Sequence, residues 1–276
     1  MRTTLQMLLP LLVFVVNSHS EVIEEEPIEP SLVFEENVVQ YSDGKGPILE
    51  GLLVYPKIAA ELTKGAPAVI VFHALDGRTD FEDLRARDLA MLGYVAFAAD
   101  LFGKGVAGND TINDNFPIVL KLLGERTNTL QSRILAAWDF VKGLSFVDEQ
   151  KIACIGFSFG GLSCVDLARI NVGLSAAVSF HGMIQSYPES NGTTSTSIQA
   201  HYGADDIYIE TDIYGFVDEL RALKADWQLM LYSDTVDGFT IPGVEKWGFI
   251  GYAYNEKSDR RSNAAMESFL AEKLWK

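Results

Sequence analysis

Apolar and polar residues follow two different periods along the chain, and each period predicts a type of element. Short continuous apolar runs rich in Val, Ile, Ala and Phe predict strands buried on both faces. They lie at residues 67–73, 94–100, 151–157, 174–181, 197–203 and 227–233. Amphipathic segments between them predict helices. These lie at residues 79–93, 129–142, 159–170 and 210–225, with a last helix from about Asp259.

Residues 38–43 and 48–56 add a predicted hairpin at the start of this alternation. Strands that alternate with helices along a chain favour a parallel sheet. No internal repeat or linker divides the sequence. We therefore expect a single-domain α/β fold, with a mostly parallel central sheet of about eight strands flanked by helices on both faces.

The N-terminus differs in composition from the rest of the chain. Residues 1–20 combine one basic residue, a short apolar run and small residues before position 21, which is typical of a secretory signal peptide. The apolar run is shorter than the ~20 residues that cross a bilayer. Residues 21–36 are rich in glutamate and predict a solvated acidic arm. The α/β domain is expected at residues 37–276.

Charge limits the partners that we expect. The chain has 22 basic and 38 acidic residues and a formal net charge of −16. This excess disfavours nucleic acids and anionic membranes. A small neutral ester or lactone is the expected ligand, and a monomer or weak homodimer the expected state. Two glycosylation sequons, at Asn109 and Asn191, agree with a secreted protein.

The two cysteines, Cys154 and Cys164, fall on a predicted strand and on the helix that follows it. Apolar surroundings favour buried packing residues. In an oxidising compartment, a disulfide between the strand and the helix is the alternative.

The sequence Gly-Phe-Ser-Phe-Gly, residues 156–160, stands between that strand and helix. A strand, Gly-x-Ser-x-Gly and a helix form the arrangement of a nucleophile elbow. Ser158 is the candidate nucleophile. The backbone N–H of Phe159, at the helix start, is the natural donor to an oxyanion. Residues 103–108 also match Gly-x-Gly-x-x-Gly, but no helix follows them directly, so they predict a loop and not a dinucleotide site.

Four segments together resemble the dienelactone hydrolase family of α/β-hydrolases, in matching order over nearly all of the chain after the signal. They are residues 73–105, 155–161, 203–206 and 237–272. The resemblance implies hydrolysis of small esters or lactones without a cofactor. No metal site is expected, because the histidines lack the spacing of metal ligands. It implies a nucleophile after the fifth strand, an acid after the seventh and a histidine after the eighth.

Carried over by position, the resemblance places the nucleophile at Ser158, where the family usually has cysteine. It places the acid at Asp206, with Asp205 as the alternative, and a second oxyanion donor at the N–H of Leu75. Ala74 stands where the family commonly has a glutamate that controls its cysteine, which agrees with a serine nucleophile. The arginine that many members carry near the histidine has no match in residues 238–243. An anionic lactone is therefore not expected.

The family's histidine position falls on Asp237. A serine hydroxyl needs a neighbouring group to take its proton, and imidazole suits that task near neutral pH. An ionised carboxylate is a weak base, and Asp206 and Asp237 in one site would raise each other's pKa. The expected base is therefore weakened or relocated.

Outside the signal, His73, His181 and His201 remain, each near the end of a predicted strand. His181 is the candidate relocated base, because its strand is expected between those of Ser158 and Asp206. The alternative is that His181 packs under the site. His73 and His201 are expected to fix loops. Two functions follow: a secreted serine ester hydrolase, or a catalytically silent hydrolase fold that binds a ligand or partner.

Overall fold

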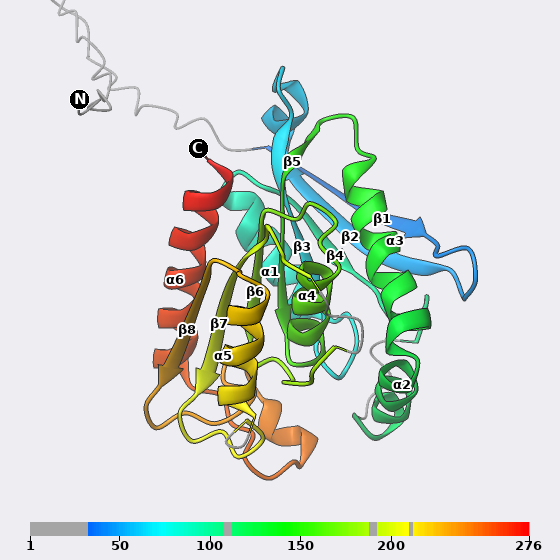
Figure 1. The fold of residues 1–276 in the computed structure, drawn as a ribbon. Coiled ribbons are helices and arrows are strands. Elements are labelled where there is room, and N and C mark those ends of the chain that lie inside the picture. The colour runs from blue at the N-terminus through cyan, green and yellow to red at the C-terminus, as the bar shows by residue number, and fades with distance from the viewer. Residues whose placement is uncertain (1–32, 107–111, 188–191, 210–211, 276) are drawn as a thin grey trace, which may run out of the picture. The chain divides into compact units, whose positions relative to one another are not determined.

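The computed structural model describes residues 33–106, 112–187, 192–209 and 212–275 (Figure 1). The expected signal peptide and both sequon asparagines lie outside these residues. The strands are β1 (Phe34–Tyr41), β2 (Leu49–Pro56), β3 (Ala66–Phe72), β4 (Val95–Ala99), β5 (Val147–Phe157), β6 (Ala176–Phe180), β7 (Ser197–Gly203) and β8 (Trp227–Tyr232). The helices are α1 (Asp80–Met91), α2 (Ile112–Gly124), α3 (Gln131–Lys142), α4 (Phe159–Arg169), α5 (Ile213–Ala222) and α6 (Glu256–Leu274).

The strands form one sheet of eight, in the order β1-β2-β4-β3-β5-β6-β7-β8. β1 pairs antiparallel with β2, and β2 pairs antiparallel with β4. All other neighbours are parallel. The expected mostly parallel sheet of about eight strands is confirmed.

Strand β3 shows how the sheet buries both faces. Ala68, Ile70 and Phe72 pack into one apolar cluster and Val69 and Val71 into the other. This period of two explains the continuous apolar run, because each face needs its own set of side chains. Helices α3, α4 and α5 cover the first face, and α1 and α6 cover the second (Figure 1).

Three features of the structure differ from what the sequence predicted. Helix α2 was not predicted, because Pro117 and a polar start interrupt its apolar pattern. A five-residue π-helical turn, Arg126–Leu130, joins it to α3. Strand β1 begins at Phe34, inside the stretch expected to be a solvated arm. Glu35 of that strand forms an ion pair with Lys57 at 2.9 Å.

The topology places the candidate site residues at one edge of the sheet. β3, β5, β6, β7 and β8 are parallel, so their carboxyl ends meet at the same edge. Each of these strands is followed within a few residues by a candidate site residue. Among the described residues, no helix is long and apolar enough to cross a membrane.

Candidate active site

Ser158 occupies the turn between β5 and α4 in a conformation that few non-glycine residues adopt. Its φ is 50° and its ψ is −111°. The Ser158 N–H donates to the Phe180 carbonyl at 3.0 Å, and the Ser158 carbonyl accepts from the Met183 N–H at 3.3 Å. Such backbone strain costs about 1–3 kcal/mol and persists where the surroundings enforce it, often at functional sites. The expected nucleophile elbow is therefore present in the backbone.

Two glycines make this turn sterically accessible. A Cβ on Gly160 would lie 2.2 Å from the carbonyl oxygen of Phe72, and a Cβ on Gly156 would lie 2.0 Å from that of Gly160. No side chain fits at either position. The helix can therefore approach the sheet closely enough to place Ser158 at the carboxyl edge.

The Ser158 hydroxyl differs from the sequence prediction. A nucleophile elbow normally exposes its serine hydroxyl above the sheet, but Ser158 is only 1% exposed. Within the described part of the chain, Ser158 Oγ has no hydrogen-bond partner. The backbone of Met183, which bonds the Ser158 carbonyl, belongs to the loop after β6 that packs over the elbow. This loop comes from a distant part of the sequence, so the pattern around Ser158 did not reveal it.

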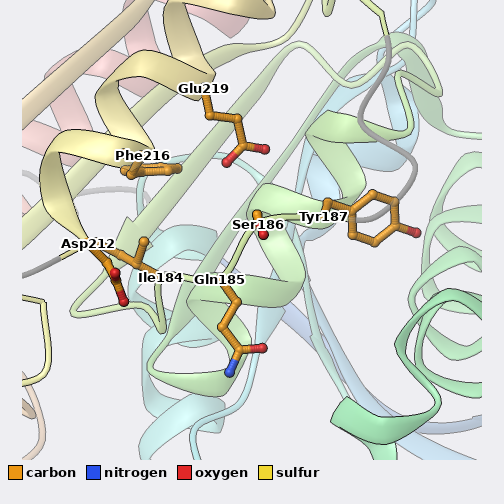
Figure 2. A pocket seen from close by; sticks show the side chains of 8 residues that line it. Ile184, Gln185, Ser186, Tyr187, Asp212, Phe216 and Glu219 are labelled. Carbon is orange, nitrogen blue, oxygen red and sulfur yellow. The ribbon is translucent and has the colours of Figure 1, made fainter.

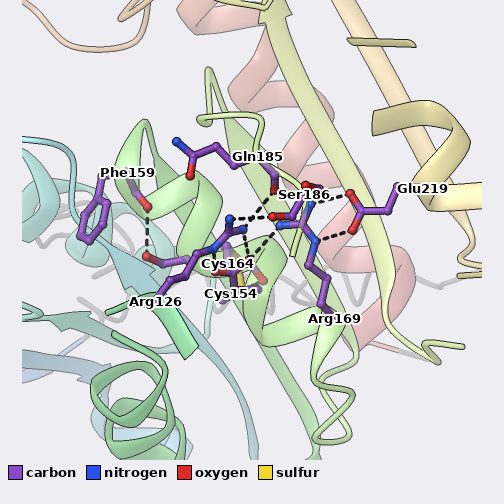
Figure 3. A network of polar contacts seen from close by, with 10 residues as sticks. Arg126, Cys154, Phe159, Cys164, Arg169, Gln185, Ser186 and Glu219 are labelled. Carbon is purple, nitrogen blue, oxygen red and sulfur yellow. Dashed lines mark hydrogen bonds and ion pairs between the residues drawn. A yellow bond between two sulfur atoms is a disulfide. The ribbon is translucent and has the colours of Figure 1, made fainter. Parts of the chain in front are cut away.

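A disulfide joins the strand and the helix on either side of the elbow. Cys154 on β5 and Cys164 on α4 are bonded, with their Cα atoms 5.9 Å apart, and both are fully buried (Figure 3). The preferred expectation of two separate packing thiols is therefore wrong. Sequence spacing could not show that the two side chains face each other. The bridge encloses Ser158 in a short covalent loop.

Two backbone amides are available beside the elbow. Phe159 is the first residue of α4, where an N–H has no acceptor within the helix. Leu75 follows β3 and lines the pocket described below. Among the described residues, neither N–H donates to a protein acceptor. These are the two amides expected to hold an oxyanion.

A buried carboxyl group, which the sequence prediction missed, holds the Leu75 loop. Glu82 on α1 accepts from the Ala74 N–H at 3.1 Å through Oε1. Through Oε2 it accepts from the Thr79 N–H and hydroxyl at 2.9 Å each, which completes a capping box. Burial, together with the charge of Asp76, raises the pKa of Glu82 to about 8. The Thr-x-x-Glu spacing is the signal that identifies this residue in the sequence.

The two candidate acids after β7 differ in their exposure to solvent. Asp206 is 4% exposed and lines the pocket, whereas Asp205 is exposed and does not. Asp206 Oδ1 accepts from the Tyr208 N–H at 2.8 Å. Burial raises the pKa of Asp206. The position preferred by the sequence analysis is thus the one that faces the pocket.

Asp237, the position expected to correspond to the family's histidine, lies in a loop after β8. It is 6% exposed, and its Oδ1 accepts from the Gly238 N–H at 2.6 Å. Burial, and then the charge of Asp206, raises the pKa of Asp237 to about 8. At neutral pH its carboxyl group is therefore mostly protonated, and only its minor ionised fraction is able to accept a proton.

His181 is buried at the end of β6 and lines the pocket. Its Nε2 lies 2.8 Å from the Thr240 hydroxyl, and its Nδ1 lies 3.4 Å from Asp237 Oδ1. Burial lowers the pKa of His181 to about 3, so the ring is neutral. The ring forms no hydrogen bond to Ser158 or Asp206, contrary to what a base relocated to this position would need. Its positive φ of 38° turns it toward Thr240, which no local pattern predicts.

The other two histidines have structural partners. His73 Nε2 accepts from the Leu101 N–H at 3.0 Å, and its Nδ1 lies 2.8 Å from the Ala74 carbonyl. His201 lies between the Gln199 amide and the Tyr232 hydroxyl, at 2.9 Å from each. The His73 ring joins two loops, as expected, whereas the His201 ring contacts side chains on β7 and β8 instead of a loop. No group of three potential metal ligands occurs in the described ranges.

A pocket of about 380 Å³ opens over this edge of the sheet. Its polar lining includes Asp206, Asp237, His181, Tyr208 and Tyr252. Its apolar lining includes Leu75, Phe116, Met183, Ile184, Ile209 and Phe249. A mostly apolar cavity with a few convergent polar groups suits a small ligand that is largely uncharged.

Comparison with known proteins agrees with this geometry. The dienelactone hydrolase-like promiscuous phosphotriesterase P91 from metagenomic libraries is 31% identical, with a TM-score of 0.80 over 87% of this chain and 98% of P91. The uncharacterized protein K02A2.1 of Caenorhabditis elegans is 31% identical over 156 residues, which are 55% of this chain and 98% of that protein. An acetyl xylan esterase from Paenibacillus sp. R4 shares the fold at 16% identity, with a TM-score of 0.62 over 91% of this chain and 87% of the esterase.

A sequence model of the dienelactone hydrolase family matches residues 49–274. That range contains the elbow, the two amides expected to hold an oxyanion, and the carboxyl ends of β3, β5, β6, β7 and β8. The chain therefore belongs to the dienelactone hydrolase family of α/β-hydrolases.

Proposed function

We propose that this protein hydrolyses small carboxylic esters or lactones, with Ser158 as its nucleophile and without a histidine in the family's base position. The observation that carries the proposal is the elbow itself. Ser158 has a strained backbone at the start of α4, and the N–H groups of Phe159 and Leu75 have no protein acceptor among the described residues. A pair of such donors stabilises the negative oxygen that forms when a carbonyl is attacked.

In this mechanism Ser158 Oγ forms a bond to the carbonyl carbon of the ester. The carbonyl oxygen becomes an oxyanion between the Leu75 and Phe159 N–H groups. The Ser158 hydroxyl proton passes through water to the leaving oxygen, so the tetrahedral intermediate expels an alcohol and leaves an acyl-serine. A second water then attacks the acyl carbon, returns the proton to Ser158 Oγ and releases a carboxylic acid. Proton transfer is the weak step, because Asp237 is protonated and the His181 ring is turned toward Thr240. Oxyanion stabilisation and binding alone still give about 10³- to 10⁴-fold acceleration over water.

The test is covalent labelling of the purified protein with a serine-directed fluorophosphonate, together with hydrolysis of short-chain aryl esters. We expect slow labelling and slow turnover, both abolished in Ser158→Ala. A matched control is Ser195→Ala, an exposed serine outside both the elbow and the pocket. Unlabelled native protein with no Ser158-dependent hydrolysis would refute the proposal.

A second candidate function is ligand binding without turnover. Two observations favour it: Ser158 Oγ is buried and has no hydrogen-bond partner among the described residues, and position 237 holds a carboxyl group that is mostly protonated at neutral pH. The labelling experiment separates the two functions. A protein that binds esters in the pocket but does not react through Ser158 has the second function.

We also propose that the protein is secreted and carries glycans at Asn109 and Asn191. The buried disulfide supports this, because disulfides form and persist in oxidising compartments. The expected result is a secreted chain that begins near residue 21 and loses mass on treatment with an N-glycosidase. A secreted chain of unchanged mass would refute the glycans, and a chain retained in the cytosol would refute secretion.

A further inference from the structure

A second cavity lies next to the pocket over the elbow. It has a volume of about 640 Å³ and lies between the loop Ile184–Tyr187 and helix α5 (Figure 2). The two cavities share the side chains of Ile184, Gln185 and Asp212. The two cavities therefore adjoin each other at these three residues.

The wall between the cavities is held by buried ion pairs (Figure 3). Arg126 Nη1 and Nη2 donate to the carbonyls of Ser186 and Gln185 at 3.0 and 3.1 Å. The same guanidinium contacts Asp166 through two hydrogen bonds of 2.7 Å. Asp166 is 4% exposed and belongs to α4, the helix that begins at the elbow. The loop thus keeps a fixed position relative to Ser158.

The charges of the second cavity favour a cation over an anion. Its described lining contains Asp212 and Glu219 but no lysine or arginine. Arg169 binds both carboxylate oxygens of Glu219, at 2.8 and 2.7 Å, and so balances its charge. Asp212 is different, because it forms no ion pair within the described part of the chain and is exposed. A chain with a formal net charge of −16 strengthens this preference.

Asp212 also lacks the contact that its position normally provides. It is the N-cap residue of α5, yet its side chain makes no capping hydrogen bond. The carboxylate instead lines both cavities, near the Phe216 ring (Figure 2). A carboxylate beside an aromatic ring is the combination that recognises an alkylammonium group, because charge attraction and cation–π attraction act together.

We propose that the two adjoining cavities bind esters whose alcohol part carries an ammonium group, with Asp212 as the residue that selects the charge. The acyl part lies in the apolar pocket that Leu75 lines, and the ammonium group lies at Asp212, which lines both cavities. This inference rests on the proposed ester hydrolase function. It replaces the neutral substrate expected from the sequence with a cationic one.

The experiment measures binding separately from turnover. Full-length mature Ser158→Ala protein is titrated with acetylcholine and with 3,3-dimethylbutyl acetate, which has the same shape but a carbon in place of the charged nitrogen. We expect acetylcholine to bind about fivefold more tightly at low salt, as one partly exposed carboxylate and one aromatic ring allow. Adding Asp212→Asn should remove the difference. Adding Asp205→Asn, an equal charge change on an exposed residue outside both cavities, should leave it.

Equal affinity for the two esters, tighter binding of the neutral ester, or no binding of either would overturn the inference. So would a preference for acetylcholine that survives Asp212→Asn. Whether the native protein hydrolyses esters is decided by the Ser158-dependent assay described above. Failure of charge selection and failure of catalysis are therefore observed in different experiments.

Discussion

The protonated state of Asp237 makes a quantitative prediction for the Asp237→Asn variant. Asparagine has nearly the same shape as a protonated aspartic acid and keeps an oxygen that can accept from the Gly238 N–H. Between its ordinary pKa of 3.8 and its folded-state pKa of about 8, Asp237 binds a proton in the folded chain and releases it on unfolding. The folded protein therefore loses stability as pH rises through this window.

The size of the effect follows from the shift. One pKa unit corresponds to about 1.4 kcal/mol, so a rise from 3.8 to about 8 costs the folded native protein about 6 kcal/mol in total above that pH. Asparagine does not ionise and removes this term. We expect the stability of Asp237→Asn relative to the native protein to increase by about 1.4 kcal/mol for each pH unit between pH 5 and pH 8.

Denaturant unfolding at pH 5, 6.5 and 8 measures this difference. Other groups that titrate, such as Glu82, are present in both proteins and largely cancel when the two are compared. Asp205→Asn serves as the control, because it removes an exposed carboxylate one residue from Asp206. Parallel stability profiles for Asp237→Asn and the native protein would show that Asp237 is ionised at neutral pH, and the argument about the base would fail.

Three further substitutions test other parts of the site. Glu82→Ala removes the acceptor of two buried N–H groups and leaves a cavity, so we expect denaturant unfolding to show a loss of about 3 kcal/mol and fluorophosphonate labelling to slow; unchanged values for both would contradict the role given to Glu82. Replacing Cys154 and Cys164 together by alanine should destabilise the fold by about 2 to 3 kcal/mol, as expected for opening a short disulfide loop, and the native protein should contain no free thiol in a denaturing thiol assay. Arg126→Met breaks a buried ion pair of Asp166, so we expect a stability loss of about 3 kcal/mol. We also expect weaker acetylcholine binding when this change is added to Ser158→Ala protein. Unchanged affinity would show that this ion pair does not hold the cavity wall in place.

The parts of this structure that follow from local pattern could be predicted from the sequence. Strands such as β3 are long apolar runs, because both faces of the sheet are covered. The elbow was recognisable because Gly156 and Gly160 permit an approach that no side chain allows. The positions of Asp206 and Leu75 followed from the resemblance to the family, since the strand order matches.

The parts that depend on contacts between distant segments could not be predicted. The direction of the His181 ring depends on Thr240, 59 residues further along the chain. The burial of Ser158 depends on a loop after another strand. The wall of the second cavity depends on Arg126, which reaches two carbonyls about 60 residues away. Side-chain direction and long-range pairing leave no periodic signal in a single sequence.

The central claim is that Ser158 is a hydrolytic nucleophile that lacks only an imidazole at position 237. The most direct measurement is kcat/KM for a short-chain aryl ester in Asp237→His, in the native background and with Ser158→Ala added. Because a positioned general base contributes about 10²- to 10⁴-fold, we predict an increase of at least about a hundredfold that disappears in the double variant. A folded Asp237→His protein with an unchanged rate, or a rate that does not depend on Ser158, would contradict the claim.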